Sequence, residues 1–136
     1  CPHLLNTSGS LPQLILKEFV EKLFKCNVLY NTRKIIQPFE LDIYLPKYKI
    51  AFEYDGAYWH NNFVTNDGLK DLLCVKNGIK LFRIPETSKN YLEDIKLSLI
   101  ELLDEINELI DFNINAEDVN KINININFVG WRFFGC

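Results

Sequence analysis

Four acidic residues lie close together in two short apolar segments, ELDIYLP and KYKIAFEYDG: Glu40, Asp42, Glu53 and Asp55. Both segments alternate apolar and polar residues, which is typical of β-strands with one buried face. A hairpin with its turn at residues 47–48 would place Asp42 opposite Glu53 and Glu40 opposite Asp55. The spacing therefore predicts two pairs of facing carboxylates on one face of a hairpin.

Facing carboxylates need a cation nearby. At a separation of about 5 Å they repel by ~0.8 kcal/mol in water and by ~3 kcal/mol at an effective dielectric constant of 20. A divalent metal ion is the natural partner, and the alternative is an acidic strand face that is simply solvated. A solvated face usually mixes in Lys, Thr or Ser, whereas the charged positions here are all acidic. The metal interpretation requires Asp42 and Glu53 to point to the same side of the sheet, without lysine or arginine neutralising them.

Length and charge are compatible with one folded domain that can meet nucleic acid. The chain has 136 residues and a net charge of −3. Residues 12–89 carry 12 Lys and Arg against 9 Asp and Glu, whereas residues 90–136 carry 3 against 9. The mildly basic part holds the acidic cluster, so DNA binding is permitted. No apolar run approaches the roughly 20 residues that span a membrane.

Cysteine usage indicates an intracellular, reducing environment. The four cysteines, at positions 1, 26, 74 and 136, are far apart and form no CxxC pair. We expect Cys26 and Cys74 to be buried thiols in apolar helical surroundings. Because the chain begins at Cys1 and lacks methionine, we also expect it to come from a longer protein with further domains.

The pattern of residues predicts a mixed α/β sheet flanked by helices. We expect a flexible leader over 1–10, a core domain over 11–112 and a C-terminal strand extension of the same domain over 113–136. On the first helix, Gln13 lies on the flank of the apolar stripe and Glu18 faces away from it. The expected elements are helix 11–25, strand 27–36, the two hairpin strands, helix 67–76, strand 79–84, helix 91–112 and strand 122–128.

The acidic segment also resembles a known family. Asp42 is followed by ten residues, Glu53, one residue and Asp55, and then by Gly56 and the segment Tyr58-Trp59-His60. Together with residues 67–84, this layout resembles the PD-(D/E)XK nuclease superfamily. The most similar branch is that of the very-short-patch-repair endonucleases and of phage and intron-associated homing endonucleases. The resemblance implies a restriction-endonuclease-like αβββαβ core and an intracellular protein encoded by a phage or mobile element.

The resemblance also implies roles for residues of the acidic segment. Asp42 and Glu53 would bind Mg²⁺, or Mn²⁺ as its substitute, together with the main-chain carbonyl of Tyr54. Asp55 stands where many members have lysine, so another group must act on the attacking water. His60 would transfer protons near neutral pH; the alternative is a surface histidine.

Residues outside the acidic pair are candidates for contacts with DNA. Tyr58 and Trp59 would stack on bases, or alternatively cover the edge of the sheet. Lys70 and Arg83 would contact phosphate, although Lys70 has the alternative of an ordinary solvated helix lysine. In related chains the first helix often carries a metal-binding glutamate, and Gln13 takes that position here.

These expectations define a metal-dependent DNA endonuclease of the homing or patch-repair kind, which nicks DNA or cuts both strands. The substitutions at Gln13 and Asp55 leave an alternative from another class, a catalytically inactive nuclease fold that binds nucleic acid or protein. An RNase or a structure-specific resolvase on the same scaffold is a further alternative.

Overall fold

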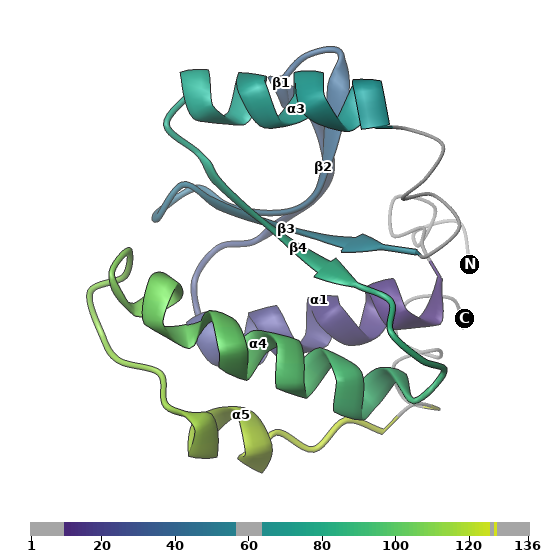
Figure 1. Cartoon of the computed structure of the whole chain (residues 1–136). Coiled ribbons are helices and arrows are strands. Elements are labelled where there is room, and N and C mark those ends of the chain that lie inside the picture. The colour runs from purple at the N-terminus through teal and green to yellow at the C-terminus, as the bar shows by residue number, and fades with distance from the viewer. Residues whose placement is uncertain (1–9, 57–63, 126, 128–136) are drawn as a thin grey trace. The chain divides into compact units, whose positions relative to one another are not determined.

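The computed structural model describes residues 10–56, 64–125 and 127, which fall into two units. A strand unit covers Asn27–Thr87, and a helical unit combines the residues before it with Ser88 onward. The elements are α1 (Leu11–Phe24), β1 (Leu29–Ile36), β2 (Phe39–Leu45), β3 (Ile50–Asp55), α3 (Val64–Lys76), β4 (Lys80–Pro85), α4 (Tyr91–Asn107) and α5 (Ala116–Lys121) (Figure 1).

The strand unit is a four-stranded mixed sheet with one helix against it. The strand order is β1-β2-β3-β4, with β4 parallel to β3 and the other pairs antiparallel. The chain crosses from β3 to β4 through α3, which packs on β4 and β1 (Figure 1). A buried cluster joins this helix to the sheet and includes Tyr44, Ala51, Cys74 and Ile79. The predicted mixed α/β class is therefore confirmed, with α3 packed on the sheet.

The register of the central hairpin agrees with the sequence pattern. Ile43 pairs with Phe52, Tyr44 with Ala51 and Leu45 with Ile50. A turn closes the hairpin, in which the Tyr48 amide donates to the Leu45 carbonyl. Each strand thus keeps the alternation that puts its acidic residues on one face.

The turn after α3 is also as the sequence predicts. Gly78 has a φ of +71°, the left-handed conformation that glycine adopts at helix ends. The Ile79 amide donates to the Cys74 carbonyl at 2.8 Å and closes the helix. The strand predicted over 79–84 follows directly as β4.

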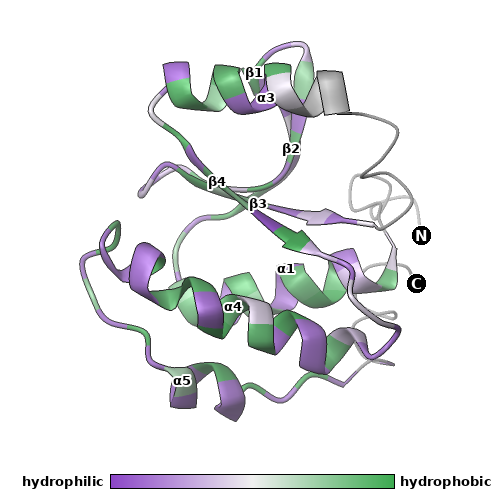
Figure 2. Ribbon diagram, in the orientation of Figure 1, coloured by the Kyte–Doolittle hydropathy of each residue, from purple (hydrophilic) through white to green (hydrophobic). Residues whose placement is uncertain are grey.

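The helical unit contains α1, α4 and α5, with contacts between each pair. The buried face of α4 is formed by Ile95, Leu99, Leu103 and Ile106, as its periodicity predicts. Figure 2 shows hydrophobic and hydrophilic residues alternating along this helix. None of the described helices is long and apolar enough to cross a bilayer.

A helix expected over 91–112 ends earlier, at Asn107. The Asn107 side chain donates to the Ile114 carbonyl at 2.8 Å and accepts from the Ile114 amide at 2.9 Å. These two hydrogen bonds fold the following segment back. The helix therefore stops although apolar residues continue to Ile110.

The predicted C-terminal strand is wrong over the described residues 122–125, which have no strand pairing. Residues 116–121, between the helix and the strand that the sequence predicts, form α5. The Asn115 side chain accepts from the Asp118 amide at 2.9 Å, and Asp118 accepts from the Asn115 amide at 3.0 Å. This reciprocal cap favours a helix, and asparagine is a poor strand former, so alternation of Ile with Asn does not suffice.

The expectation that Glu18 faces away from the core is also wrong. Glu18 is 3% exposed and its neighbour Lys17 is 1% exposed. All residues from 14 to 20 are buried, so this part of α1 has no solvated face. A helical wheel that assumes one wet face therefore fails for α1.

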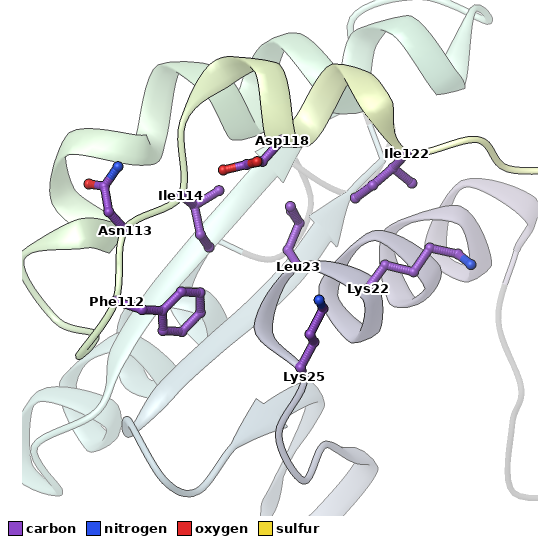
Figure 3. Close-up of a pocket in the computed structure, with 8 residues that line it drawn as sticks. All are labelled: Lys22, Leu23, Lys25, Phe112, Asn113, Ile114, Asp118 and Ile122. Atoms are coloured by element: carbon purple, nitrogen blue, oxygen red, sulfur yellow. The ribbon is translucent and has the colours of Figure 1, made fainter.

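One pocket lies in the helical unit, with a volume of about 340 Å³ (Figure 3). It is lined by Lys22, Leu23, Lys25, Phe112, Asn113, Ile114, Asp118 and Ile122. None of the residues that the sequence nominates for chemistry lies in this pocket.

Candidate acid and lysine site

The candidate site lies in the strand unit, where β3 and β4 end. Asp42 directly precedes Ile43 and Glu53 directly follows Phe52, and Ile43 and Phe52 are paired in the hairpin register. Because β3 and β4 are parallel, their carboxyl ends meet at the same edge, and Glu53 pairs with Arg83 there. In open α/β sheets this edge is where ligands usually bind.

Glu53 is a buried carboxyl group, 6% exposed. Burial, and secondly the negative charge of Asp42, raise the pKa of Glu53 from 4.5 to about 7, against opposing effects of Lys70 and Arg83. This effect of Asp42 on the pKa of Glu53 is in line with the hairpin register, in which the two acids lie opposite each other. A carboxyl group with a pKa near neutrality is characteristic of functional sites.

Lys70 reaches this carboxylate from α3. Its ammonium forms an ion pair with Oε2 of Glu53, and its side chain is only 13% exposed. The alternative interpretation of Lys70 as a solvated helix lysine is therefore wrong. Lys70 lies on the inward face of the helix, four residues before the buried Cys74.

Arg83 joins three carboxylates from two other elements. Its Nη1 lies 3.2 Å from Oδ1 of Asp55 and 3.7 Å from Oε1 of Glu53, and its Nη2 lies 2.8 Å from Oδ1 of Asp71. Burial lowers the pKa of Arg83, but the hydrogen bond to Asp71 and the charges of the carboxylates outweigh it and raise that pKa. A DNA phosphate would have to compete with these partners for the guanidinium.

The connected groups do not balance in charge when all are ionised. The four carboxylates of Asp42, Glu53, Asp55 and Asp71 face the two cations of Lys70 and Arg83. Acidic groups therefore outnumber basic groups among these six described residues, which we call the acid–lysine cluster. A site of this composition suits a cation better than an anion.

Solvent can reach the cluster from the side of α3 and β4. A cavity of about 270 Å³ is lined by Asp71, Cys74, Val75, Ile79, Lys80, Leu81 and Arg83. Cys74 is a free, buried thiol as predicted, and burial followed by the charge of Glu53 raises its pKa. Cys26 forms no disulfide within the described residues and is only half-buried, so the expectation of a buried thiol holds in part.

The expectation that nothing basic neutralises the acids is wrong for Glu53, because Lys70 and Arg83 both pair with it. Among the described residues, no group of three or more His, Cys, Asp or Glu is arranged to hold a metal ion. The condition set for the metal interpretation is therefore not met at Glu53, and a metal ion there would have to displace Lys70 and Arg83 from its carboxylate. Asp and Glu oxygens are ligands that suit Mg²⁺, which needs only one or two carboxylates and keeps several waters. Asp42 and Glu53 would be those ligands.

Several nominated residues do not join the cluster. Tyr58, Trp59 and His60 lie outside the described residues. Gln13 belongs to the helical unit, where its Oε1 accepts a hydrogen bond from the Ser10 amide at 2.8 Å. Tyr54 donates its hydroxyl to Glu86 at 3.4 Å, which does not test the role of its carbonyl.

Sequence reasoning missed how Lys70 and Asp71 are used. Lys70 shares a helix face with Leu73 and Cys74, at the i+3 and i+4 spacing that marks one side of a helix. The apolar character of that face was a signal that this lysine is drawn inward. Its partner Glu53 is distant in the sequence, and no local pattern identifies it.

Comparisons with protein-family models, with curated proteins and with solved structures each found no match. The interpretation of the site therefore rests on its geometry and on the residues that form it.

Proposed function

We propose that this chain is a metal-dependent DNA endonuclease with a restriction-endonuclease-like core. The supporting observation is the convergence of Asp42 from β2, Glu53 from β3 and the Lys70 ammonium from α3. Two acids and a lysine are the residue types that the PD-(D/E)XK resemblance leads us to expect in one site. The element order agrees as well, with α1 followed by three strands, α3 and β4.

Lys70 replaces the lysine that the sequence motif lacks. Asp55 stands where many members of the superfamily have lysine, and Arg83 binds its carboxylate. The ammonium that the chemistry needs comes instead from the helix after β3. In a nuclease site made of acids and a lysine, the ammonium lies close to a carboxylate. The ion pair between Lys70 and Glu53 agrees with this arrangement.

Hydrolysis of a phosphodiester needs negative charge to be stabilised in the transition state. A magnesium ion bound by Asp42 and Glu53 would act as a Lewis acid and lower the pKa of a bound water. The Lys70 ammonium then neutralises charge that develops on the phosphate oxygens. We keep for His60 the role in proton transfer that the resemblance to homing and patch-repair endonucleases implies.

Cleavage of supercoiled plasmid in Mg²⁺ or Mn²⁺ tests this proposal. We expect the wild type to produce nicked or linear DNA and Asp42→Ala to produce none. Lys70→Ala should lower the rate by about 10²–10³, the usual loss for one group that stabilises the transition state. Lys76→Ala is the matched control, because it removes an exposed lysine of the same helix. Equal rates for the two lysine variants would refute the role of Lys70.

A catalytically inactive nuclease fold is the second candidate, favoured by one observation. Glu53 and Asp55 already have basic partners in Lys70 and Arg83, so these charges are stabilised without a metal ion. In this case the wild type would bind DNA, with an affinity that falls as salt rises, but would cleave nothing. RNA and branched DNA in the same assay identify an RNase or a resolvase.

A further inference from the structure

Two consecutive residues of α3 reach different strands. The Lys70 ammonium pairs with Glu53 on β3, and the Asp71 carboxylate accepts a hydrogen bond at 2.8 Å from Nη2 of Arg83 on β4. Neighbouring helical residues point about 100° apart around the axis. The two contacts therefore fix both the rotation of the helix and its position along the sheet.

Arg83 is itself held in place by the sheet. Its Nη1 binds the carboxylates of Asp55 and Glu53 on the adjacent strand, which leaves Nη2 directed at Asp71. An exposed ion pair between two flexible side chains contributes little order. Here one partner is fixed by two carboxylates, so Asp71 meets a guanidinium that is already oriented.

Among the side chains of α3 that the structure describes, from residue 68 onward, the other contacts are apolar. Leu69, Leu72 and Val75 are exposed, and the inward side offers Leu73 and Cys74 near the far end of the helix. Apolar contacts are non-directional, so they permit small rotations that a directed hydrogen bond resists. The turn that carries Lys70 is therefore oriented chiefly by its neighbour.

We infer that Asp71 is a positioning residue that, through Arg83, places the Lys70 ammonium at the carboxylate of Glu53. The expected effect on catalysis rests on the proposed function, whereas the effect on the position of Lys70 can be measured without any cleavage activity. Asp71 is 54% exposed, so replacing it does not disturb the buried cluster beneath.

Chemical labelling of lysine in the intact chain tests the structural part. Reductive methylation followed by mass spectrometry gives the rate for each lysine, and we expect Lys70 to react more slowly than the exposed Lys76. Asp71→Asn should raise the Lys70 rate about fivefold, as expected for loss of one ion pair at a partly exposed site, and leave Lys76 unchanged. Asp71→Glu keeps the negative charge, so Lys70 should again be labelled slowly in this variant.

The matched control is Glu93→Gln, which removes an acid that is 60% exposed and pairs with a less exposed lysine, Lys96. This variant should leave Lys70 labelling unchanged. In plasmid cleavage, Asp71→Asn should lower kcat by about fivefold, because a misplaced Lys70 stabilises the transition state less well.

The outcomes separate the two proposals. If Lys70 is labelled at the same rate in Asp71→Asn as in the wild type, the positioning role is overturned, whether or not the protein cleaves DNA. Faster Lys70 labelling in Asp71→Asn, together with a wild type that cleaves no DNA, retains the positioning role and overturns the nuclease proposal. Faster labelling with unchanged kcat shows that Asp71 places Lys70 but that catalysis does not use that placement, which overturns the catalytic consequence.

Discussion

Replacement of Glu53 by glutamine should change how stability depends on pH. In the folded chain the pKa of Glu53 is raised to about 7, above its ordinary 4.5. Between these values the folded chain holds a proton that the unfolded chain has released. Raising the pH through this window therefore removes stability that is fully present below pH 4.5.

The size of this effect follows from the change in pKa. A rise of about 2.5 corresponds to about 3 kcal/mol, at 1.36 kcal/mol for each unit of pKa. Glutamine has no proton to release, so Glu53→Gln lacks this loss. We expect the difference in unfolding free energy between variant and wild type to shift by about 3 kcal/mol in favour of the variant from pH 4.5 to pH 8.

Urea unfolding followed by circular dichroism, at intervals from pH 4.5 to pH 8.5, measures this difference. Glu93→Gln is the control, because its carboxylate is exposed on α4 and its substitution should give no such shift. A difference that stays constant with pH, or that moves in favour of the wild type as pH rises, would refute the reasoning. It would mean that Lys70 and Arg83 outweigh burial and the charge of Asp42.

Magnesium adds a second arm to the same measurement. A metal ion at Asp42 and Glu53 favours the ionised carboxylate, so it should stabilise the wild type above pH 7 and have little effect at pH 4.5. At a hundred times its Kd the ion contributes about 2.7 kcal/mol. Glu53→Gln should lose most of this gain.

Two further predictions concern the scaffold. Gly78→Ala should destabilise the chain by about 1–2 kcal/mol, because φ is +71° there. Gly68→Ala lies in a helix with open space around it and should stabilise the chain by about 0.5–1 kcal/mol. The two variants should shift the thermal unfolding midpoint in opposite directions, and shifts of the same sign would contradict this. Asn107→Ala should cost about 2 kcal/mol, because it removes both hydrogen bonds to the buried backbone of Ile114. Asn113→Ala, at a neighbouring exposed position, is the control in urea unfolding, and equal stabilities would contradict a structural role for Asn107.

Local patterns in the sequence predicted much of the strand unit. Alternation in the two hairpin segments, with the length of the turn between them, was enough for the register that pairs Ile43 with Phe52. The predicted end of the helix at residue 76 was also correct. Such features depend on residues close in the chain, and that is why pattern reasoning finds them.

Features that depend on distant partners were not predicted. The burial of Lys70 requires Glu53, and the end of α4 at Asn107 requires Ile114. The burial of Glu18 requires a helix enclosed on every side, which periodicity alone does not indicate. The acids of the candidate site could be found from spacing, but the cations that meet them come from other elements.

The short connection between α3 and β4 determines which residues of β4 lie beside those of β3 at the far end of these two strands. The Lys80 amide donates to the Lys49 carbonyl at 2.9 Å, and this bond starts the alignment in which Arg83 comes to lie beside Glu53. One residue inserted after Gly78 would bring Phe82 to that position and turn the guanidinium to the other side of the sheet. A deeply placed carboxylate would then face a phenyl ring. The ionic character of this edge therefore depends on the length of the connection after α3.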